Sequence, residues 1–357
     1  MERQRDLDAR LARFVTTRDA RDLWPDVSVV SFRAAQRELA RVTCGVLTGS
    51  ARGVPLRHTV ALTARALGVA AFAGGMGPLI GYWCETGAVA ADDEIAERFA
   101  TALDHGRRRA RRMRGTLDAV SARLAARGIG VCVLRSARTR LRYFPDPGTR
   151  TSADIDLLVR PDDQEAAGGA LWDAGYVDAA GRWSRPDEPA VARSLDFAHA
   201  DDPCSVHLHC TLDGPPAKGA RPSLGTPDSS EWEVAADLGP SVHVLPQPLL
   251  LAYLATRTSS RFGAIMLIRL VELVLVMQRD FKRCPDAWRA FDGLVARTET
   301  SPLVFPALDL AERLAPGTVD PEVRERLAAA TPVRLRGLVR RTVPATALRM
   351  HPLPPTA

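Results

Sequence analysis

Apolar and polar residues alternate most regularly between residues 128 and 210. Residues 130–135 (GVCVLR) and 152–160 (SADIDLLVR) are short, apolar and rich in β-branched side chains, which predicts two buried strands. Between residues 162 and 174 the apolar positions fall at helical spacing instead. Residues 194–200 and 204–210 alternate around an Asp-Asp-Pro turn, which predicts a β-hairpin. The central part of the chain is therefore expected to combine strands and helices.

The segments on both sides of this core carry the spacing of amphipathic helices. Before it, helices are predicted near 1–24, 32–50, 56–73 and 92–116, and after residue 247 the pattern is helical again. We therefore predict an α/β (α+β) protein with a small mixed sheet between two helical regions. The expected divisions are a helical region 1–115, a core 116–245, a helical region 246–330 and a basic, Pro-containing tail 331–357 that is frayed.

Charge adds one candidate surface to this picture. The net charge is +6, and the run 107–114 (RRRARRMR) could bind phosphates or nucleic acid. Acidic residues lie close by and no aromatic residue is interleaved, so a solvated helix face is the favoured interpretation. Nucleic acid remains a possible partner that the sequence does not favour.

The chain shows no signal for a membrane or an export route. The longest apolar stretch, 262–277, is interrupted by Arg269 and Glu272 and is too short to span a bilayer. The charged N-terminus is not followed by an apolar segment of the kind found in signal peptides. The six cysteines are scattered and form no C-x-x-C pair, which favours reduced thiols. We therefore expect a cytoplasmic protein with no membrane partner.

The strongest chemical signal is the pair Asp154 and Asp156 in the second predicted strand. Residues two apart in a strand project from the same face, so both carboxylates should stand side by side. Two adjacent carboxylates repel each other unless a positive group lies between them. A hard divalent cation with oxygen ligands fulfils that need, so a metal site at Asp154 and Asp156 is predicted.

Several motifs together resemble a known family. They are VLRS (133–136), YFPDP (143–147), RTSADIDLLVRPD (150–162), AGY (174–176) and VHLHC (206–210). Residues 128–210 resemble the nucleotidyltransferase superfamily, whose core is a palm like that of DNA polymerase β. Within it, the chain is similar to a poorly characterised bacterial nucleotidyltransferase family with the successive motifs Leu-Lys-Gly, Asp-x-Asp-Leu-Leu-Val, Gly-Tyr and Asp/Glu-Leu-His-Trp.

The resemblance implies a reaction and a set of roles. A nucleoside monophosphate would pass from an NTP substrate to an acceptor, and Mg²⁺ (or Mn²⁺) held by Asp154 and Asp156 would contact the phosphates. Arg135, Ser136 and Arg150 would bind the nucleotide. The acceptor stays open between a small molecule, a peptide or natural product, RNA and protein. Association with the family makes the tailoring of secondary metabolites, or natural-product biosynthesis, one reading.

The chain departs from the family pattern at its third acid, where His207 stands. Imidazole titrates near neutral pH, so His207 could serve as the catalytic base, and as a softer ligand it could favour Mn²⁺ over Mg²⁺. Asp196, Asp201 or Asp202 could supply the missing oxygen instead. His207 and His209 could also form half of a zinc site, which we disfavour. The alternative function is a catalytically degenerate protein that binds nucleotides or a partner.

Two further charges invite simple structural interpretations. Arg150 could form a salt bridge with Asp154 or Asp156 instead of binding phosphate. Glu272 lies in an apolar helix, where an unpaired carboxylate is costly, so Arg269 is its expected partner.

Overall fold

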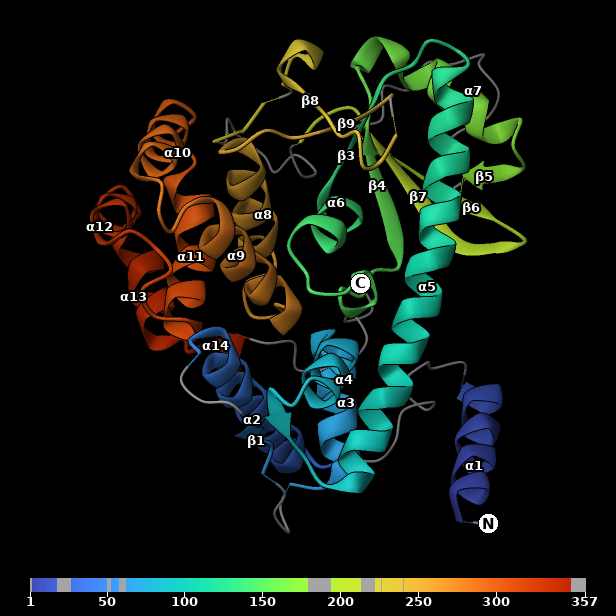
Figure 1. Cartoon of the computed structure of the whole chain (residues 1–357), viewed down its shortest axis with the longest axis vertical. Helices are drawn as coiled ribbons and strands as arrows, with labels where there is room; N and C mark the ends of the chain where they lie inside the picture. Colours follow the sequence, from blue (N-terminus) through green and yellow to red (C-terminus); the bar gives the residue numbers. More distant parts are fainter. Residues whose placement is uncertain are drawn as a thin grey trace.

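The described residues form a mixed β-sheet with helices on both of its faces and a separate two-stranded parallel sheet of β1 (Val54–Pro55) and β2 (Val89–Ala90), and this confirms the predicted fold class (Figure 1). The structure, a computed structural model, describes residues 2–17, 27–49, 53–57, 62–178, 194–212, 222–225, 227–239 and 241–347. Parts of the predicted segments 1–24, 32–50, 56–73 and 331–357 lie outside these residues.

The described part of the chain contains a seven-stranded sheet with the order β5-β6-β7-β4-β3-β9-β8. Strands β4 and β7 pair in parallel, as do β3 and β9, while the remaining neighbours are antiparallel. The predicted hairpin is present as β6 and β7. The strands are β3 (Val131–Val133), β4 (Asp154–Leu158), β5 (Tyr176–Asp178), β6 (Ser194–His199), β7 (Asp202–His209), β8 (Glu233–Val234) and β9 (Val242–Val244).

The register of the central strands fixes which side chains meet. In the parallel pair, Asp156 lies opposite His207, and in the antiparallel hairpin Asp196 lies opposite the same histidine. The intervening apolar side chains turn to the other face, where the helix α5 (Asp93–Ala125) covers them. This back-face core includes Met113, Leu117, Ile155, Leu157, Val206 and Leu208.

Helix α5 is the longest helix among the described residues and extends beyond the predicted boundary at residue 115. Asp92 caps it by accepting a hydrogen bond from the Ile95 amide at 2.9 Å. Its first half packs with the N-terminal helices and its second half lies along the sheet (Figure 1). The other N-terminal elements are α1 (Glu2–Thr17), α2 (Val29–Leu47), β1 (Val54–Pro55), α3 (Ala64–Gly74), α4 (Gly77–Glu85) and β2 (Val89–Ala90).

Close backbone contacts attach the loop before β4 to α5. A Cβ on Gly148 would lie 2.6 Å from the Arg107 amide nitrogen, and one on Gly106 would lie 2.3 Å from the Gly148 carbonyl oxygen. Only glycine permits this approach. The contact fixes η2 (Pro147–Thr149), and hence the start of β4, on the surface of α5. Short elements around the sheet are α6 (Arg135–Arg142), η3 (Pro161–Asp163), α7 (Gln164–Trp172) and η4 (Ser229–Glu231).

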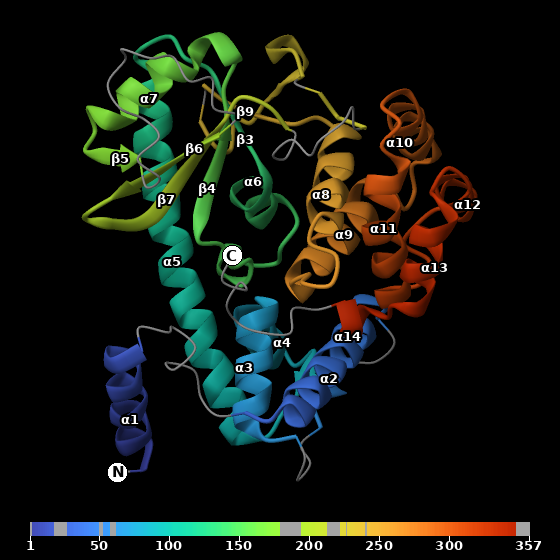
Figure 2. The same ribbon diagram turned by 180° about the vertical axis from the view of Figure 1, so that it is seen from behind.

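We call the face of the sheet opposite α5 the front face. The C-terminal helices lie beside it, and α2 to α4 lie below both the sheet and these helices (Figure 2). Leu158 of β4 belongs to the same buried cluster as Tyr253 and Leu254, so the sheet and these helices share a core. The helices are α8 (Leu249–Ser259), α9 (Leu267–Asp280), α10 (Pro285–Arg297), α11 (Ser301–Leu314), α12 (Pro321–Ala329), α13 (Val333–Arg341) and α14 (Pro344–Ala347).

The expected frayed tail from residue 331 is wrong for the described residues. They form α13 and α14, and Val339 is fully buried. The Arg313 guanidinium donates to the Val339 carbonyl oxygen at 2.7 Å and so fixes the end of α13 on α11. The basic composition of this segment, with its low content of acidic residues, suggested a frayed tail. The segment instead forms α13, an amphipathic helix whose basic side chains face outward.

Among the described helices, no single one is both long and apolar enough to cross a membrane. Helices α3 and α4 satisfy the same length and composition test only as a pair, bent by 115° at the break between them.

Candidate active site

Asp154, Asp156 and His207 lie together on the front face of the sheet. The His207 Nδ1 atom is 3.4 Å from Asp154 Oδ2 and 3.8 Å from Asp156 Oδ1, so both carboxylates face one imidazole edge. The opposite edge, at Nε2, lies 3.9 Å from Asp196 Oδ1. The Asp154 and His207 side chains are 28% and 27% exposed, while that of Asp156 is 1% exposed. The cluster is thus open to solvent on the Asp154 side.

Asp156 is held by two cationic or polar partners. Arg135 forms an ion pair with its Oδ1 atom, and His209 Nε2 lies 2.9 Å from the same oxygen. Burial alone would raise the pKa of Asp156, but the attraction of Arg135 and the contact with His209 outweigh it and keep the pKa well below its usual range. The second oxygen, Oδ2, is buried and has no hydrogen-bond partner in the described structure.

A chain of hydroxyl groups connects the start of α6 to Asp154. The Ser136 hydroxyl is 2.8 Å from that of Ser152, and the Ser152 hydroxyl lies 2.9 Å from both Asp154 Oδ1 and the Asp154 carbonyl oxygen. Ser136 itself is only 3% exposed. In this structure its side chain orients the loop that carries Asp154, and the first amides of α6 are left for other partners.

Arg150 does not pair with Asp154 or Asp156, so that prediction is wrong. It forms a two-pronged ion pair with Glu272 of α9, with N···O distances of 3.0 and 2.8 Å. Thr139 of α6 also donates to Glu272. The expected Arg269–Glu272 pair is therefore wrong as well, because a partner 122 residues away in the chain takes its place.

The basic run 107–114 is largely engaged within the protein. Arg107 pairs with Glu85 and Asp146 at 2.8 Å each. Arg109 donates to the Ser152 carbonyl oxygen at 2.7 Å, just before the strand with the two aspartates. These contacts give part of the run a structural role.

The donor atoms of this site are suited to a divalent metal ion. Asp156, His207 and His209 each offer one ligand atom, and these atoms lie within 4.8 Å of one another. Ligands bound at 2.0–2.2 Å to a common ion stand roughly 3–4 Å apart. The unpartnered Oδ2 of Asp156 is also the kind of buried oxygen that a cation would satisfy.

Comparison with known proteins now bears on this geometry. Residues 69–316 match the profile of a family described as uncharacterised nucleotidyltransferase, which is more than half of the chain. The chain belongs to this nucleotidyltransferase family. No curated protein and no solved structure gives a significant match.

In this nucleotidyltransferase the structure brings the predicted residues Asp154, Asp156 and His207 together, but the sequence did not indicate several of their neighbours. The sequence offers His209 only as half of a disfavoured zinc site, whereas in the structure it contacts Asp156 from the same strand face as His207. The Ser152 relay and the Glu272 pair had no local signal, because each joins residues from different elements.

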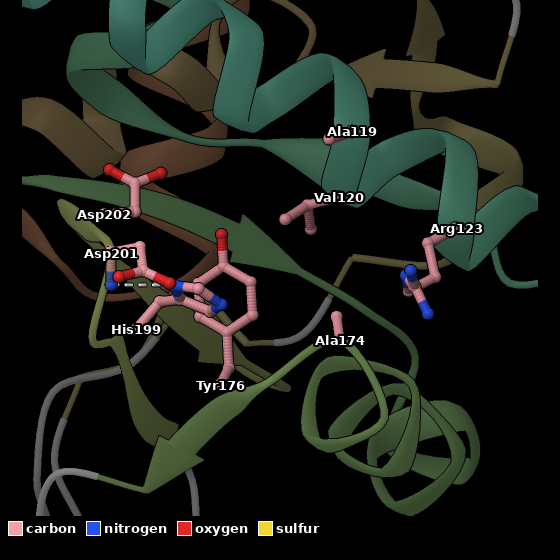
Figure 3. A pocket seen from close by; sticks show the side chains of 8 residues that line it. All are labelled: Ala119, Val120, Arg123, Ala174, Tyr176, His199, Asp201 and Asp202. Atoms are coloured by element: carbon pink, nitrogen blue, oxygen red, sulfur yellow. Dashed lines mark hydrogen bonds between the residues drawn. The ribbon is translucent and has the colours of Figure 1, made fainter.

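The nucleotidyltransferase also has a separate cavity of about 270 Å³ on the opposite, α5-covered face of the sheet (Figure 3). Tyr176 and His199 lie with their ring centroids 5.0 Å apart in it, and the Asp201 amide donates to His199 Nδ1 at 3.1 Å. Asp201 and Asp202, which were considered as substitutes for the third acid, line this cavity. Asp196 alone of the three considered aspartates approaches His207.

Proposed function

We propose that the protein is a metal-dependent nucleotidyltransferase that moves a nucleoside monophosphate from an NTP to a hydroxyl-bearing acceptor. The observation that carries the proposal is the cluster of Asp154, Asp156 and His207 on one sheet face of a nucleotidyltransferase fold. In this reaction the acceptor oxygen bonds to the α-phosphorus, the bond to the bridging oxygen breaks, and pyrophosphate leaves.

Asp154 and Asp156 would hold the divalent ion. When bound, the ion neutralises negative charge that develops on the transferring phosphate. Arg135 and His209 both contact Oδ1 of Asp156 and keep this carboxylate ionised. Because they fix the orientation of the carboxylate, they also fix the position of its second oxygen, Oδ2. The Ser136–Ser152 relay fixes Asp154 in the same way.

His207 would accept the proton of the acceptor hydroxyl. It stands at the position of the family's third acid and is open to solvent, as a base that meets an incoming acceptor must be. Asp196 beside Nε2 would stabilise the imidazolium that results. Arg135 and Arg150 are the other two residues predicted to bind the nucleotide. Their first role would be to neutralise buried carboxylates, since Arg135 pairs with Asp156 and Arg150 pairs with Glu272.

A second candidate function is a nucleotide- or partner-binding protein without catalysis. It is favoured by the burial of Asp156 and by the ion pair with Arg135, which competes with a metal for that carboxylate. A measurement of transfer activity distinguishes the two functions, because a binding protein would bind NTP but would form no product.

The experiment is incubation with each labelled NTP, with Mn²⁺ or Mg²⁺, and with extract fractions separated into small molecules, peptides, RNA and proteins. We expect metal-dependent transfer of label and release of pyrophosphate, with loss in Asp154→Asn and Asp156→Asn. Asp162→Asn, at an exposed position after the same strand, is the matched control. Transfer that persists in both variants of the pair contradicts the assignment.

The role of His207 has its own test within the same assay. His207→Asp restores the acid expected from the family pattern and can still accept a proton, so it should retain transfer. His207→Gln removes the base and should lower the rate by about 10²–10⁴-fold. An unchanged rate in His207→Gln would remove this residue from the mechanism.

A further inference from the structure

The ion pair between Arg135 and Asp156 is incomplete, unlike the other buried ion pair of this region. Arg150 donates through two nitrogen atoms to the two oxygens of Glu272, at 3.0 and 2.8 Å, and so closes that pair as a fork. Arg135 donates to Oδ1 of Asp156 alone, and its Nε atom is buried without a partner among the described residues. Oδ2 of Asp156 is likewise buried and unpartnered there. The pair therefore leaves one carboxylate oxygen for a second cation.

The other oxygen of Asp156, Oδ1, is already used by two groups. Arg135 donates to it, and His209 Nε2 lies 2.9 Å away. The side chains of Arg135 and His209 are only 10% and 12% exposed, so both contacts are largely shielded from water. A metal ion bound at Oδ1 would lie against the guanidinium, and like charges in contact repel strongly where water is excluded.

The backbone holds the Arg135 guanidinium in this place. Its φ is +43°, in the left-handed region that residues other than glycine rarely adopt. A conformation of this kind persists only where the surrounding structure imposes it. The preceding residue, Leu134, is fully buried and donates its amide to the Asp156 carbonyl oxygen at 3.0 Å. Arg135 is therefore fixed beside Asp156 through the backbone of Asp156 itself.

The charges of the cluster suit one divalent ion better than two. Asp154, Asp156 and Arg135 together leave a single net negative charge when both histidines are neutral. Asp196 lies at the opposite edge of the His207 ring, 3.9 Å from Nε2. Two ions in one site stand about 3.5–4 Å apart and need strongly negative ligands to offset their mutual repulsion. This cluster offers a guanidinium and imidazoles instead of further carboxylates.

We propose that the Arg135 guanidinium is a permanent cation of the active site and takes the place of a second metal ion on Asp156. The site then binds one divalent ion, through Asp154 and the remaining oxygen of Asp156. The inference rests on the proposed function for the presence of that ion. It makes Arg135 a positioning residue for Asp156, whereas the sequence suggested a contact with the nucleotide. A guanidinium stays charged at any ordinary pH, so this positive charge does not depend on the supply of metal.

The test counts the Mn²⁺ ions that the protein binds tightly without nucleotide, by electron paramagnetic resonance of the free ion. We expect one ion per wild-type chain. Arg135→Gln removes the repelling charge and frees Oδ1, so it should bind Mn²⁺ about tenfold more tightly or better. Arg135→Lys keeps the positive charge and should bind one ion with nearly the wild-type affinity.

Arg138→Gln is the matched control, because Arg138 lies on the same helix but pairs with the exposed Asp237 at 3.1 Å. Its Mn²⁺ affinity should equal that of the wild-type protein. Thermal unfolding distinguishes this role from a merely structural one. In EDTA, Arg135→Gln should unfold at a lower temperature, since Asp156 is left without its counter-charge, and Mn²⁺ should stabilise this variant more than the wild-type protein. A merely structural pair would show the same loss in both conditions.

Three results would overturn the inference: two tightly bound Mn²⁺ ions per wild-type chain, none at all, or equal affinity in the wild-type protein and Arg135→Gln. If Arg135→Gln does not fold in EDTA, the wild-type count and Arg135→Lys still decide, because a second ion in either overturns it. Nucleotide transfer by a protein that holds two ions contradicts this inference alone. One bound ion without any transfer contradicts only the proposed function.

Discussion

At the scale of single residues, the site depends on charges that are buried and paired. Asp156 and Glu272 are 1% and 2% exposed, and each is matched to an arginine from another element. A buried pair adds little net stability, but breaking it leaves one uncompensated charge. These residues therefore specify how the palm and the helices fit together.

The Arg150–Glu272 pair gives the first stability prediction. Glu272→Gln leaves Arg150 buried without its counter-charge, so the free energy of unfolding should fall by about 3–5 kcal/mol. Glu325→Gln, at an exposed helical position, should change it by less than about 0.5 kcal/mol. Urea unfolding monitored by circular dichroism measures both, and equal losses would show that the pair is not a structural link.

The same pair predicts a dependence on pH. Burial raises the pKa of Glu272, but Arg150 and Thr139 outweigh burial, so the folded-state pKa lies below the ordinary value of 4.5. The stabilising effect is therefore complete above pH 4.5 and is lost as the pH falls through the lower folded value. The stability difference between wild type and Glu272→Gln should shrink in that acidic range, as measured by urea unfolding at a series of pH values. A difference that stays constant down to acid pH contradicts the shift.

At the scale of elements, alternation in the sequence was sufficient for the strands that carry the site. The run SADIDLLVR and the VHLHC hairpin strand each place polar groups on one face, and the register confirms that Asp156 and His207 are neighbours. Helix lengths and long-range ion pairs were less predictable. No local pattern could show that Arg150 selects Glu272, whereas the helical spacing of Leu117, Val120 and Leu124 does indicate that the helix continues towards Gly128.

The attachment of η2 to α5 gives a prediction at this scale. In Gly148→Ala the new Cβ would lie 2.6 Å from the backbone nitrogen of Arg107, so η2 must move away from α5. We expect a loss of about 1–3 kcal/mol in unfolding free energy, together with lower activity because Arg150 and Asp154 follow in the chain. Gly115→Ala is the matched control.

Gly115 lies within α5, and a Cβ there would meet nothing within 4 Å. The alanine variant should therefore gain about 0.5–1 kcal/mol from helix propensity. Chemical denaturation compares the two variants, and similar changes of either sign would show that the tight contact between η2 and α5 is unimportant.

At the scale of the whole molecule, the candidate ligand site lies where the palm meets the helical region. The front face of the sheet provides the carboxylates, and Glu272 of α9 pairs with Arg150 just before β4. A ligand that contacts both should hold them together, and ligands that bind only the folded state raise its stability.

This arrangement predicts a shared response to metal and nucleotide. Mn²⁺ with a non-hydrolysable NTP at about 100 times its dissociation constant should raise the unfolding free energy by about 2.7 kcal/mol. Hydrogen exchange should slow in β4 and in α9 together, and EDTA should reverse the part of the effect that depends on the ion. Protection confined to the sheet would place the ligand away from the helices.

Helix α5 sets a limit on how this chain can be divided. Its first half belongs to the core of the N-terminal helices and its second half supplies Met113 and Leu117 to the back of the sheet. A fragment that starts at residue 116 would lack part of the helix that covers the back of the sheet. The Gly148 loop would also lose the part of α5 on which it packs. The strands that carry the candidate site therefore share their packing with the whole of α5, and we expect a fragment without this helix to lose the fold of the palm.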